Sequence, residues 1–162
     1  MGTITQEVLD QILADHALWL DDQRTGERAQ LKYADLSYTK LTDANLTNAN
    51  LIDTNLTGVD LSGANLTGAN LTDANLSDAD LFGADLSDAD LSGADLSYAS
   101  LRRVELSGAH LSYANFTGAK FGLNINDVKA IDHATFSQDA YEWLILRDDW
   151  AKVKDTVKIV NN

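Results

Sequence analysis

Hydrophobic residues recur at intervals of five through the middle of the chain. From Leu31 to Phe121 every fifth residue is apolar, and these 19 positions contain 17 Leu and two Phe. Two residues before each lies a second column, in which 15 of the 19 residues are Ala. Between and after them the chain is polar: Asp or Asn precedes the Leu or Phe in 13 repeats, and Ser or Thr follows it in 14. One short unit is therefore repeated without a slip over residues 29–123.

A period of five fits neither a regular helix nor a flat strand. A helix turns about 100° per residue, so Leu residues five apart would spread around its circumference without forming an apolar stripe. In a strand successive side chains alternate between faces, so residues five apart point in opposite directions. The Leu column can face one interior only if the chain bends in every repeat, and the intervening Ser, Thr, Gly and Asp favour turns. The spacing therefore predicts an all-β solenoid with Leu at its axis and Ala beside it.

Individual repeats resemble a known family. The segments Ala64-Asn65-Leu66-Thr67-Gly68 and Ala79-Asp80-Leu81-Phe82-Gly83 match the A-(D/N)-L-x-x consensus of pentapeptide-repeat proteins, and the resemblance covers residues 29–123. It implies a right-handed quadrilateral parallel β-helix with four repeats per coil, or about five coils in this chain. At a strand spacing of about 4.8 Å, the rod would be roughly 23 Å long.

The N-terminal segment, residues 1–28, is predicted to be a helical cap. A β-helix exposes unpaired backbone and bare Leu at its ends, which invites aggregation unless the ends are covered. The apolar residues of segment 6–22, among them Leu9 and Leu13, fall near helical spacing, and Gly26 can end the connection before the repeats begin. We therefore expect one amphipathic helix against the first coil.

Residues 124–162 are expected to form an irregular last coil and a C-terminal helix within the same domain. The five-residue phase persists at Phe136, and Ser137 is a suitable N-cap for a helix over about 138–157. One set of apolar residues has the 3-4-3-4-3 spacing of a coiled-coil seam: Trp143, Leu146, Trp150, Val153, Val157 and Val160. This spacing predicts a homodimer through the helix, with the alternative that the helix folds back onto its own rod.

The chain is strongly acidic, with a formal net charge of −13 over 162 residues. Nucleic acids and anionic membranes repel this charge, so we expect neither as a direct partner. No apolar run approaches the roughly 18 residues that span a bilayer, and the N-terminus lacks the features of a secretory signal. We therefore expect a cytoplasmic protein whose partner is another protein.

The sequence offers no candidate catalytic, cofactor-binding or metal-binding residue. There is no Cys, and the three histidines, His16, His110 and His133, are far apart and lack ligand spacing. Carboxylates are abundant, but acid–base catalysis needs a desolvated cleft that shifts a pKa, and a narrow rod filled with Leu offers none. We therefore expect no enzymatic activity and no cofactor.

One stretch of the repeats is the candidate partner surface. Residues 73–95 hold seven Asp and no Lys or Arg, and an Arg pair follows near an outward-facing Phe. The acidic side chains have the alternative role of keeping the protein soluble, and the Phe and Arg residues that of a local cation–π stack. The four tyrosines of the repeats are expected to lie outward near the two ends, as cover for the caps. The candidate surface consists of Asp73, Asp78, Asp80, Asp85, Asp88, Asp90, Asp95, Phe82, Arg102 and Arg103.

These observations favour a non-catalytic interaction or scaffold protein, without naming its partner. The alternative is a mimic of DNA, because some members of the family resemble duplex DNA and bind DNA gyrase, which they inhibit or protect from quinolones. DNA carries one charge per about 1.7 Å, or roughly 14 charges over a rod of this length. Residues 29–123 hold 12 acidic and five basic side chains, about half that density, so the charge favours the first hypothesis.

Overall fold

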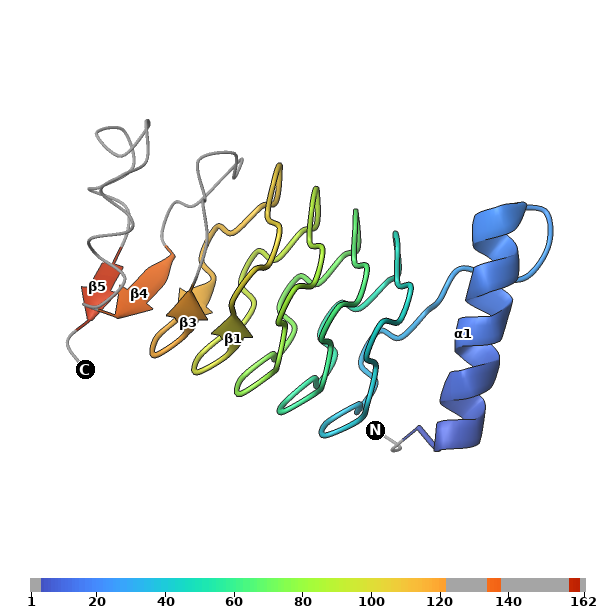
Figure 1. Cartoon of the computed structure of the whole chain (residues 1–162), viewed down its shortest axis with the longest axis horizontal. Coiled ribbons are helices and arrows are strands. Elements are labelled where there is room, and N and C mark those ends of the chain that lie inside the picture. The colour runs from blue at the N-terminus through green and yellow to red at the C-terminus, as the bar shows by residue number, and fades with distance from the viewer. Residues whose placement is uncertain (1–3, 122–133, 138–157, 161–162) are drawn as a thin grey trace.

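A computed structural model describes residues 4–121, 134–137 and 158–160 of the chain. It begins with one helix, α1 (Gln6–Asp21), which is followed by a solenoid of parallel β-bridges. Figure 1 shows α1 lying across one end of the stacked coils, with the last two strands at the other end. The strands are β1 (Ser100–Leu101), β2 (Asn115–Phe116), β3 (Lys120–Phe121), β4 (Thr135–Ser137) and β5 (Lys158–Val160).

The coils are held together by a ladder between residues 20 positions apart. Every bridge within the repeats joins such a pair, for example Gln30 with Asn50. At this rung the Leu31 amide donates to the Asn50 carbonyl at 2.8 Å, and the Asn50 amide donates to the Ala29 carbonyl at 2.9 Å. Twenty residues are four repeats, so each coil has four sides, and each side stacks on the same side of the neighbouring coils.

Each repeat turns the chain at the second residue after its Leu or Phe. All 18 of these positions from Tyr33 to Gly118 have a positive φ, and only seven of them are Gly. The next amide closes the turn, as from Ala34 to the Leu31 carbonyl at 3.0 Å. A positive φ at the third residue is the signature of a type II turn. The bend that a period of five requires is therefore built from one left-handed residue per repeat.

The Leu column fills the interior of the solenoid. Its 17 Leu residues and Phe116 are each no more than 3 % exposed. The Ala column packs beside it, and Thr54 is a polar member whose hydroxyl donates to the Leu31 carbonyl at 2.8 Å. Burial of one Leu side chain stabilises a fold by about 1.5–3 kcal/mol, so this column is the main source of stability. The inward Leu and outward polar positions confirm the prediction of a solenoid.

Helix α1 packs its apolar face on the first coil. Thr5 is its N-cap, Leu9 is 1 % exposed, and Ile12 and Leu13 pack against the same hydrophobic core as the repeats. The helix that the apolar spacing predicts over 6–22 is therefore present, with its buried residues on the side that faces the rod.

His16 joins α1 to the first repeat. Its side chain is fully buried, and Nδ1 accepts a hydrogen bond from the Ala29 amide at 3.2 Å. Nε2 makes no hydrogen bond within the described part of the chain, and the Trp19 ring stacks on His16 with centroids 5.6 Å apart. Burial lowers the pKa of His16, the nearby backbone of Thr47 opposes this effect, and the charge of Arg28 adds to it, with a net decrease. A neutral imidazole is therefore part of the contact that holds the helix on the rod.

The ladder continues past the last regular repeat. β4 pairs with β2, which aligns Phe136 with Phe116 and confirms that the five-residue phase persists at Phe136. β5 pairs in turn with β4 and aligns Val160 with Ser137, so the prediction that Val160 belongs to a helical seam is wrong. β-branched residues beside an unpaired strand edge favour a further strand. Outside the described residues lie the predicted helix over 138–157 and the other seam residues, Trp143, Leu146, Trp150, Val153 and Val157.

Gly26 links α1 to the rod, and its replacement tests how closely the two pack. Gly26 and Gly83 are both left-handed, with φ of +64° and +68°. A Cβ atom at Gly26 would meet the Asp15 carbonyl oxygen and would lie 2.7 Å from the Leu18 Cβ, whereas one at Gly83 would meet nothing within 4 Å. We expect Gly83→Ala to lower the free energy of unfolding by about 1–2 kcal/mol through φ alone, and Gly26→Ala to lower it by roughly 3 kcal/mol. Urea unfolding followed by circular dichroism measures both losses. If Gly26→Ala and Gly83→Ala lose equal stability, the close packing of Gly26 against α1 is contradicted.

The buried His16 predicts that stability falls as the solution becomes mildly acidic. The folded state holds the pKa of this ring below its usual value, while the unfolded chain takes up a proton below about pH 6.5. Its contribution is therefore complete above about pH 6.5 and is lost as the pH falls below that value. We expect the free energy of unfolding to decrease between about pH 7.5 and 5.5.

The matched control for this experiment is His110→Gln, which replaces an exposed histidine. The wild type and His110→Gln should lose the same amount of stability over this pH range, and His16→Gln should lose clearly less. The same decrease in all three proteins, measured by urea unfolding, would overturn the role of His16.

Candidate interaction surface

The 13 Asp and Asn side chains that precede a core Leu or Phe are all bound to the local backbone. In each case Oδ1 accepts the amide of the residue two positions later. Asp35 is typical, because its Oδ1 accepts the Ser37 amide at 3.1 Å and the Ser37 hydroxyl at 2.7 Å. This arrangement is an Asx turn, for which Asp and Asn are suited. The preference for Asp or Asn at this position is therefore structural.

The same hydrogen bonds favour the charged form of the carboxylates. The Ser37 hydroxyl and then the Ser37 amide lower the pKa of Asp35. The Ser62 hydroxyl and amide lower the pKa of Asp60 in the same way, because a carboxylate accepts both hydrogen bonds. One oxygen of each such side chain is committed to the turn, so at most the other is left for a partner.

The seven aspartates of the candidate surface encircle the rod and do not share one side. The four that precede a core Leu lie on four successive sides of one coil and are bound in Asx turns. The other three, Asp73, Asp78 and Asp88, are left-handed turn residues. The structure therefore does not bring the seven together into one patch. We call them the acidic belt, which consists of Asp73, Asp78, Asp80, Asp85, Asp88, Asp90 and Asp95.

Phe82 and Arg103 form a contact between neighbouring coils. The guanidinium carbon of Arg103 lies 5.4 Å from the centroid of the Phe82 ring, which is within cation–π range. The Gly83 amide donates to the Arg102 carbonyl at 2.9 Å, and this bond sets the two turns side by side. The interpretation of Phe82 and Arg103 as a local stack is thus confirmed. A role of Phe82, Arg102 and Arg103 in binding a partner stays a prediction.

The four tyrosines of the repeats flank one side of the rod. Tyr33 and Tyr113 are four coils apart and Tyr38 and Tyr98 three coils apart in the 20-residue register, so each pair lies in one column of turns. Their side chains are between 46 and 77 % exposed. The two columns border the side that contains Asp35. We call it the tyrosine-framed side, which comprises residues 33–38, 53–58, 73–78, 93–98 and 113–118.

Sequence analysis places these tyrosines near the two ends of the rod and misses that they share a side. The five-residue period alone cannot reveal this, because it does not say how many repeats form one coil, although the four repeats per coil that the family resemblance implies would have revealed it. Once a coil is known to contain 20 residues, the tyrosine numbers themselves identify the two columns.

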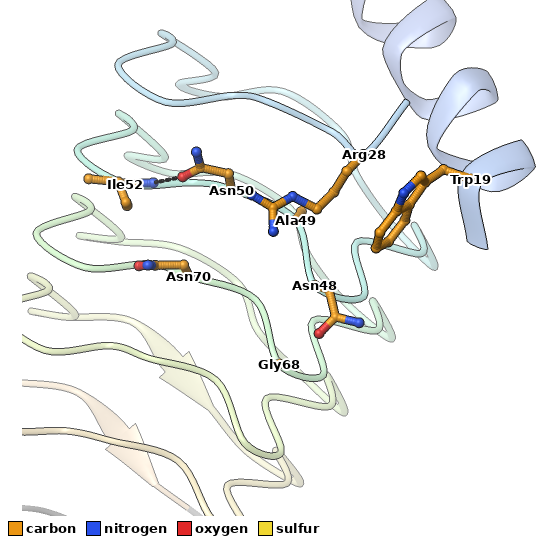
Figure 2. Close-up of a pocket in the computed structure, with 8 residues that line it drawn as sticks. All are labelled: Trp19, Arg28, Asn48, Ala49, Asn50, Ile52, Gly68 and Asn70. Atoms are coloured by element: carbon orange, nitrogen blue, oxygen red, sulfur yellow. Dashed lines mark hydrogen bonds between the residues drawn. The ribbon is translucent and has the colours of Figure 1, made fainter. Parts of the chain in front are cut away.

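A hollow lies between α1 and the first coils. Its volume is about 280 Å³, and Figure 2 shows Trp19 and Arg28 reaching from the N-terminal segment toward it. The Asn50 side chain is already engaged, because its Nδ2 donates to Gln30 Oε1 at 2.8 Å. The volume is below the roughly 300–1,000 Å³ of ordinary ligand sites, so we interpret the hollow as a gap in the packing of the cap against the rod. The lining residues are Trp19, Arg28, Asn48, Ala49, Asn50, Ile52, Gly68 and Asn70.

Sequence analysis did not find this hollow. It assigns Trp19 and Arg28 to the cap, and nothing in their spacing links them to the Asn residues of the repeats. Over the residues that the structure describes, no group of three or more His, Asp or Glu side chains could hold a metal ion. In the same part of the chain, no helix has the length and apolar character needed to cross a bilayer.

Comparison with known proteins finds related chains. A sequence model of pentapeptide repeats matches eight copies over residues 27–63, 49–88, 60–97 and 84–122, which together span more than half of the chain. Among solved structures, the pentapeptide repeat protein Rfr23 from the cyanobacterium Cyanothece 51142 is 26 % identical, with a TM-score of 0.63. That match covers 75 % of this chain and 97 % of Rfr23. No curated protein matches the chain significantly.

Two further solved structures are less similar in shape. HetL, a pentapeptide repeat protein involved in heterocyst differentiation regulation in Nostoc sp. strain PCC 7120, is 35 % identical, with a TM-score of 0.31, over 68 % of this chain and 52 % of HetL. QnrB1, a plasmid-mediated fluoroquinolone resistance protein, is 20 % identical, with a TM-score of 0.42, over 76 % of this chain and 74 % of QnrB1. Neither likeness is close enough to carry an argument about function.

The Asx turns predict that Asn replaces Asp more safely than Ala does. At Asp60, Asn keeps the Oδ1 that accepts the Ser62 amide at 3.1 Å, whereas Ala removes it. We expect Asp60→Ala to lower the free energy of unfolding at pH 7 by about 0.5–1 kcal/mol, and Asp60→Asn by less than half as much. Thermal unfolding of both variants beside the wild type measures the difference.

Acid titration of the same proteins provides the second readout. Because the pKa of Asp60 is lowered, its carboxylate stabilises the fold above about pH 4 and loses this effect as the pH falls below that value. The loss of stability below pH 4 should therefore be smaller in Asp60→Asn than in the wild type. Identical acid profiles, or equal losses from Asn and Ala at pH 7, would show that the Asx turn does not stabilise the rod.

Proposed function

Because the chain belongs to the pentapeptide-repeat family, whose fold is a right-handed β-helix solenoid, we propose that it is a non-catalytic protein that acts by binding another protein. The packing of the rod is the observation that carries this proposal. Leu and Ala fill its interior, so only the outer surface is left for recognition. That surface presents exposed aromatic side chains such as Tyr38, 77 % exposed, and Tyr113, 63 % exposed. Exposed tyrosines are typical of protein interfaces.

The protonation behaviour of the carboxylates supports binding over catalysis. Asp35 and Asp60 have lowered pKa values, whereas a carboxyl group that moves protons near neutral pH needs a raised one. The hollow beside α1 is lined by amides, one indole and one guanidinium, a set without a nucleophile or a general base. Neither place supports a reaction.

The proposal extends to the architecture of the whole chain. We propose about five coils in a quadrilateral β-helix over residues 29–123, with a helical cap in residues 1–28 and an irregular coil and helix in residues 124–162. The 20-residue register and the burial of Leu9 support the first two parts, and the pairing of β4 with β2 supports the third. We also propose that the protein is cytoplasmic.

A homodimer through the C-terminal segment remains part of the proposal, on the spacing of its apolar residues alone. Light scattering of the full chain measures the mass directly, and a monomer at about 100 µM would end the idea. The seam residues in question are Trp143, Leu146, Trp150, Val153 and Val157.

Mimicry of DNA toward gyrase has less support. The acidic belt occupies about one coil and lacks the continuous charge of duplex DNA. One side of the rod also carries Lys40 and Lys120, with Arg102 and Arg103 in its turns, which interrupts any continuous negative surface. The experiment below includes this alternative.

Affinity capture with the immobilised full chain, from cells of its native host, tests the binding role. The expected result is one retained protein that, once purified, binds the chain in a fixed stoichiometry by calorimetry. In parallel, purified gyrase should supercoil DNA at an unchanged rate with about 10 µM of the chain present. Inhibition of gyrase, or its protection from a quinolone, would favour mimicry of DNA. Failure to retain any protein that rebinds would count against the binding role itself.

A further inference from the structure

We propose that the tyrosine-framed side is a docking surface for an extended, arginine-rich segment of a partner protein. This inference rests on the proposed binding role and adds the location of the site and the chemistry of the partner. Three observations carry it: where the tyrosines stand in the backbone, how their rings are presented, and how charge is distributed over the sides of the rod.

The tyrosines occupy backbone positions that do not favour them. Tyr33, Tyr38, Tyr98 and Tyr113 have φ between 57° and 64°, in the left-handed region where a bulky side chain is strained. Of the other 14 turn residues from 33 to 118, all but Arg103 are Gly, Asp or Asn, which suit this conformation. The fold therefore has no need of Tyr at these positions, yet all four tyrosines border the same side.

The rings are held in place while they remain accessible. A Cβ atom added at Gly58 would lie 2.6 Å from a ring carbon of Tyr38, and one at Gly118 would lie 2.6 Å from a ring carbon of Tyr98. Each ring therefore rests on a glycine of the next coil, which limits its motion. Tyr38 nevertheless remains 77 % exposed and Tyr98 62 % exposed. A fixed, accessible ring is the arrangement that binds a cation over its face.

The chain's own cations already use its exposed rings in this way. The Lys32 ammonium lies 4.5 Å from the centroid of the Tyr33 ring, and the Arg103 guanidinium carbon lies 5.4 Å from that of Phe82. No basic side chain belongs to the tyrosine-framed side, so a cation over the ring of Tyr38 or Tyr98 would have to come from outside that side.

Charge makes this side complementary to a cationic partner. Its 30 residues include five aspartates and no Lys, Arg or His. The left-handed turn positions and the positions before a core Leu both contribute aspartates, so the negative charge extends from the first to the fourth coil. Cationic side chains of a partner would find carboxylates and aromatic rings together here, with no basic side chain among these 30 residues. The five aspartates are Asp35, Asp53, Asp73, Asp78 and Asp95.

The spacing of the tyrosines fits an extended peptide. Tyr33 and Tyr113 are four coils apart, or about 19 Å at the strand spacing, which about six extended residues can span. β4 and β5 continue the ladder of the same side beyond Asn115, where Lys158 aligns with Thr135, so the stretch without a basic side chain ends with the repeats. Arginine fits better than lysine, because its planar guanidinium stacks on rings and also binds carboxylates with two parallel hydrogen bonds.

Fluorescence anisotropy with a labelled peptide of alternating Arg and Thr, at about 150 mM salt, tests the proposal. The double variant Tyr38→Asn/Tyr98→Asn removes two rings and leaves side chains that suit the left-handed backbone. We expect it to bind the peptide about tenfold more weakly than the wild type, with an unchanged or higher unfolding temperature. A peptide of alternating Lys and Thr, with the same charge, should bind the wild type several-fold more weakly.

Two charge variants control for general attraction to an acidic protein. Asp53→Asn/Asp78→Asn acts on the tyrosine-framed side, and Asp85→Asn/Glu105→Gln removes the same charge from another side. Only the first should weaken binding by more than twofold. Equal weakening by both pairs, full binding by the tyrosine variant, or equal binding of the Lys peptide would each overturn the proposal.

The captured partner separates this inference from the binding role on which it rests. If the tyrosine variant retains the partner as well as the wild type does, the docking surface is wrong and the binding role stands. If the wild type itself retains no partner, the binding role fails, and the docking surface fails with it. Loss of the partner only in the tyrosine variant is the expected result.

Discussion

The hydrogen-bond ladder between residues 20 positions apart is the constraint on which the structure depends. A single coil cannot bury its own Leu side chains, since each core residue needs the coil above and the coil below to exclude water. The ladder holds these coils in register, and it forms only if every repeat turns the chain by the same amount. One left-handed residue in each repeat provides that turn. The buried Leu core, the hydrogen-bond ladder and the left-handed turn therefore depend on one another, and one five-residue repeat contains the residues for all three.

The backbone constrains some positions of the outer surface more than others. The Asp and Asn side chains that precede a core residue are bound in Asx turns, so they serve the backbone before they serve a partner. The left-handed positions need only tolerate a positive φ, which leaves their side chains freer to vary. Function should therefore be sought at the turns, and the tyrosines stand there. The acidic belt, although prominent in composition, is divided among all four sides.

Most of the rod can be predicted from the sequence, because the period of five excludes the regular alternatives. The helix at Gln6–Asp21 and the phase at Phe136 also follow from apolar spacing. Val160 was assigned wrongly because heptad spacing in a short β-branched segment does not distinguish a seam from a strand. Nothing in the sequence predicts the hydrogen bond between His16 and Ala29, since a histidine on an amphipathic helix does not reveal which backbone amide it will contact.

The candidate surface shows the same limit more clearly. The number of repeats in one coil came from family resemblance alone, and no argument from the residues fixes it. Without that number, Tyr33 and Tyr113 are merely distant in sequence; with it, they occupy one column. The hollow beside α1 depends on how a helix settles against the coils, which spacing within the helix does not specify.

The four-sided register has a consequence for how such a chain can change in length. Duplication of a whole coil would insert 20 residues, lengthen the rod by about 4.8 Å and leave every column intact. Gain or loss of one repeat would instead rotate everything beyond it by a quarter turn. The packing of the core would change little, because one Leu replaces another. If the repeat is gained or lost between Tyr38 and Tyr98, however, Tyr98 and Tyr113 would move to a different side from Tyr33 and Tyr38. Inheritance of this surface therefore requires insertions and deletions to come in multiples of four repeats, a rule that packing alone does not impose.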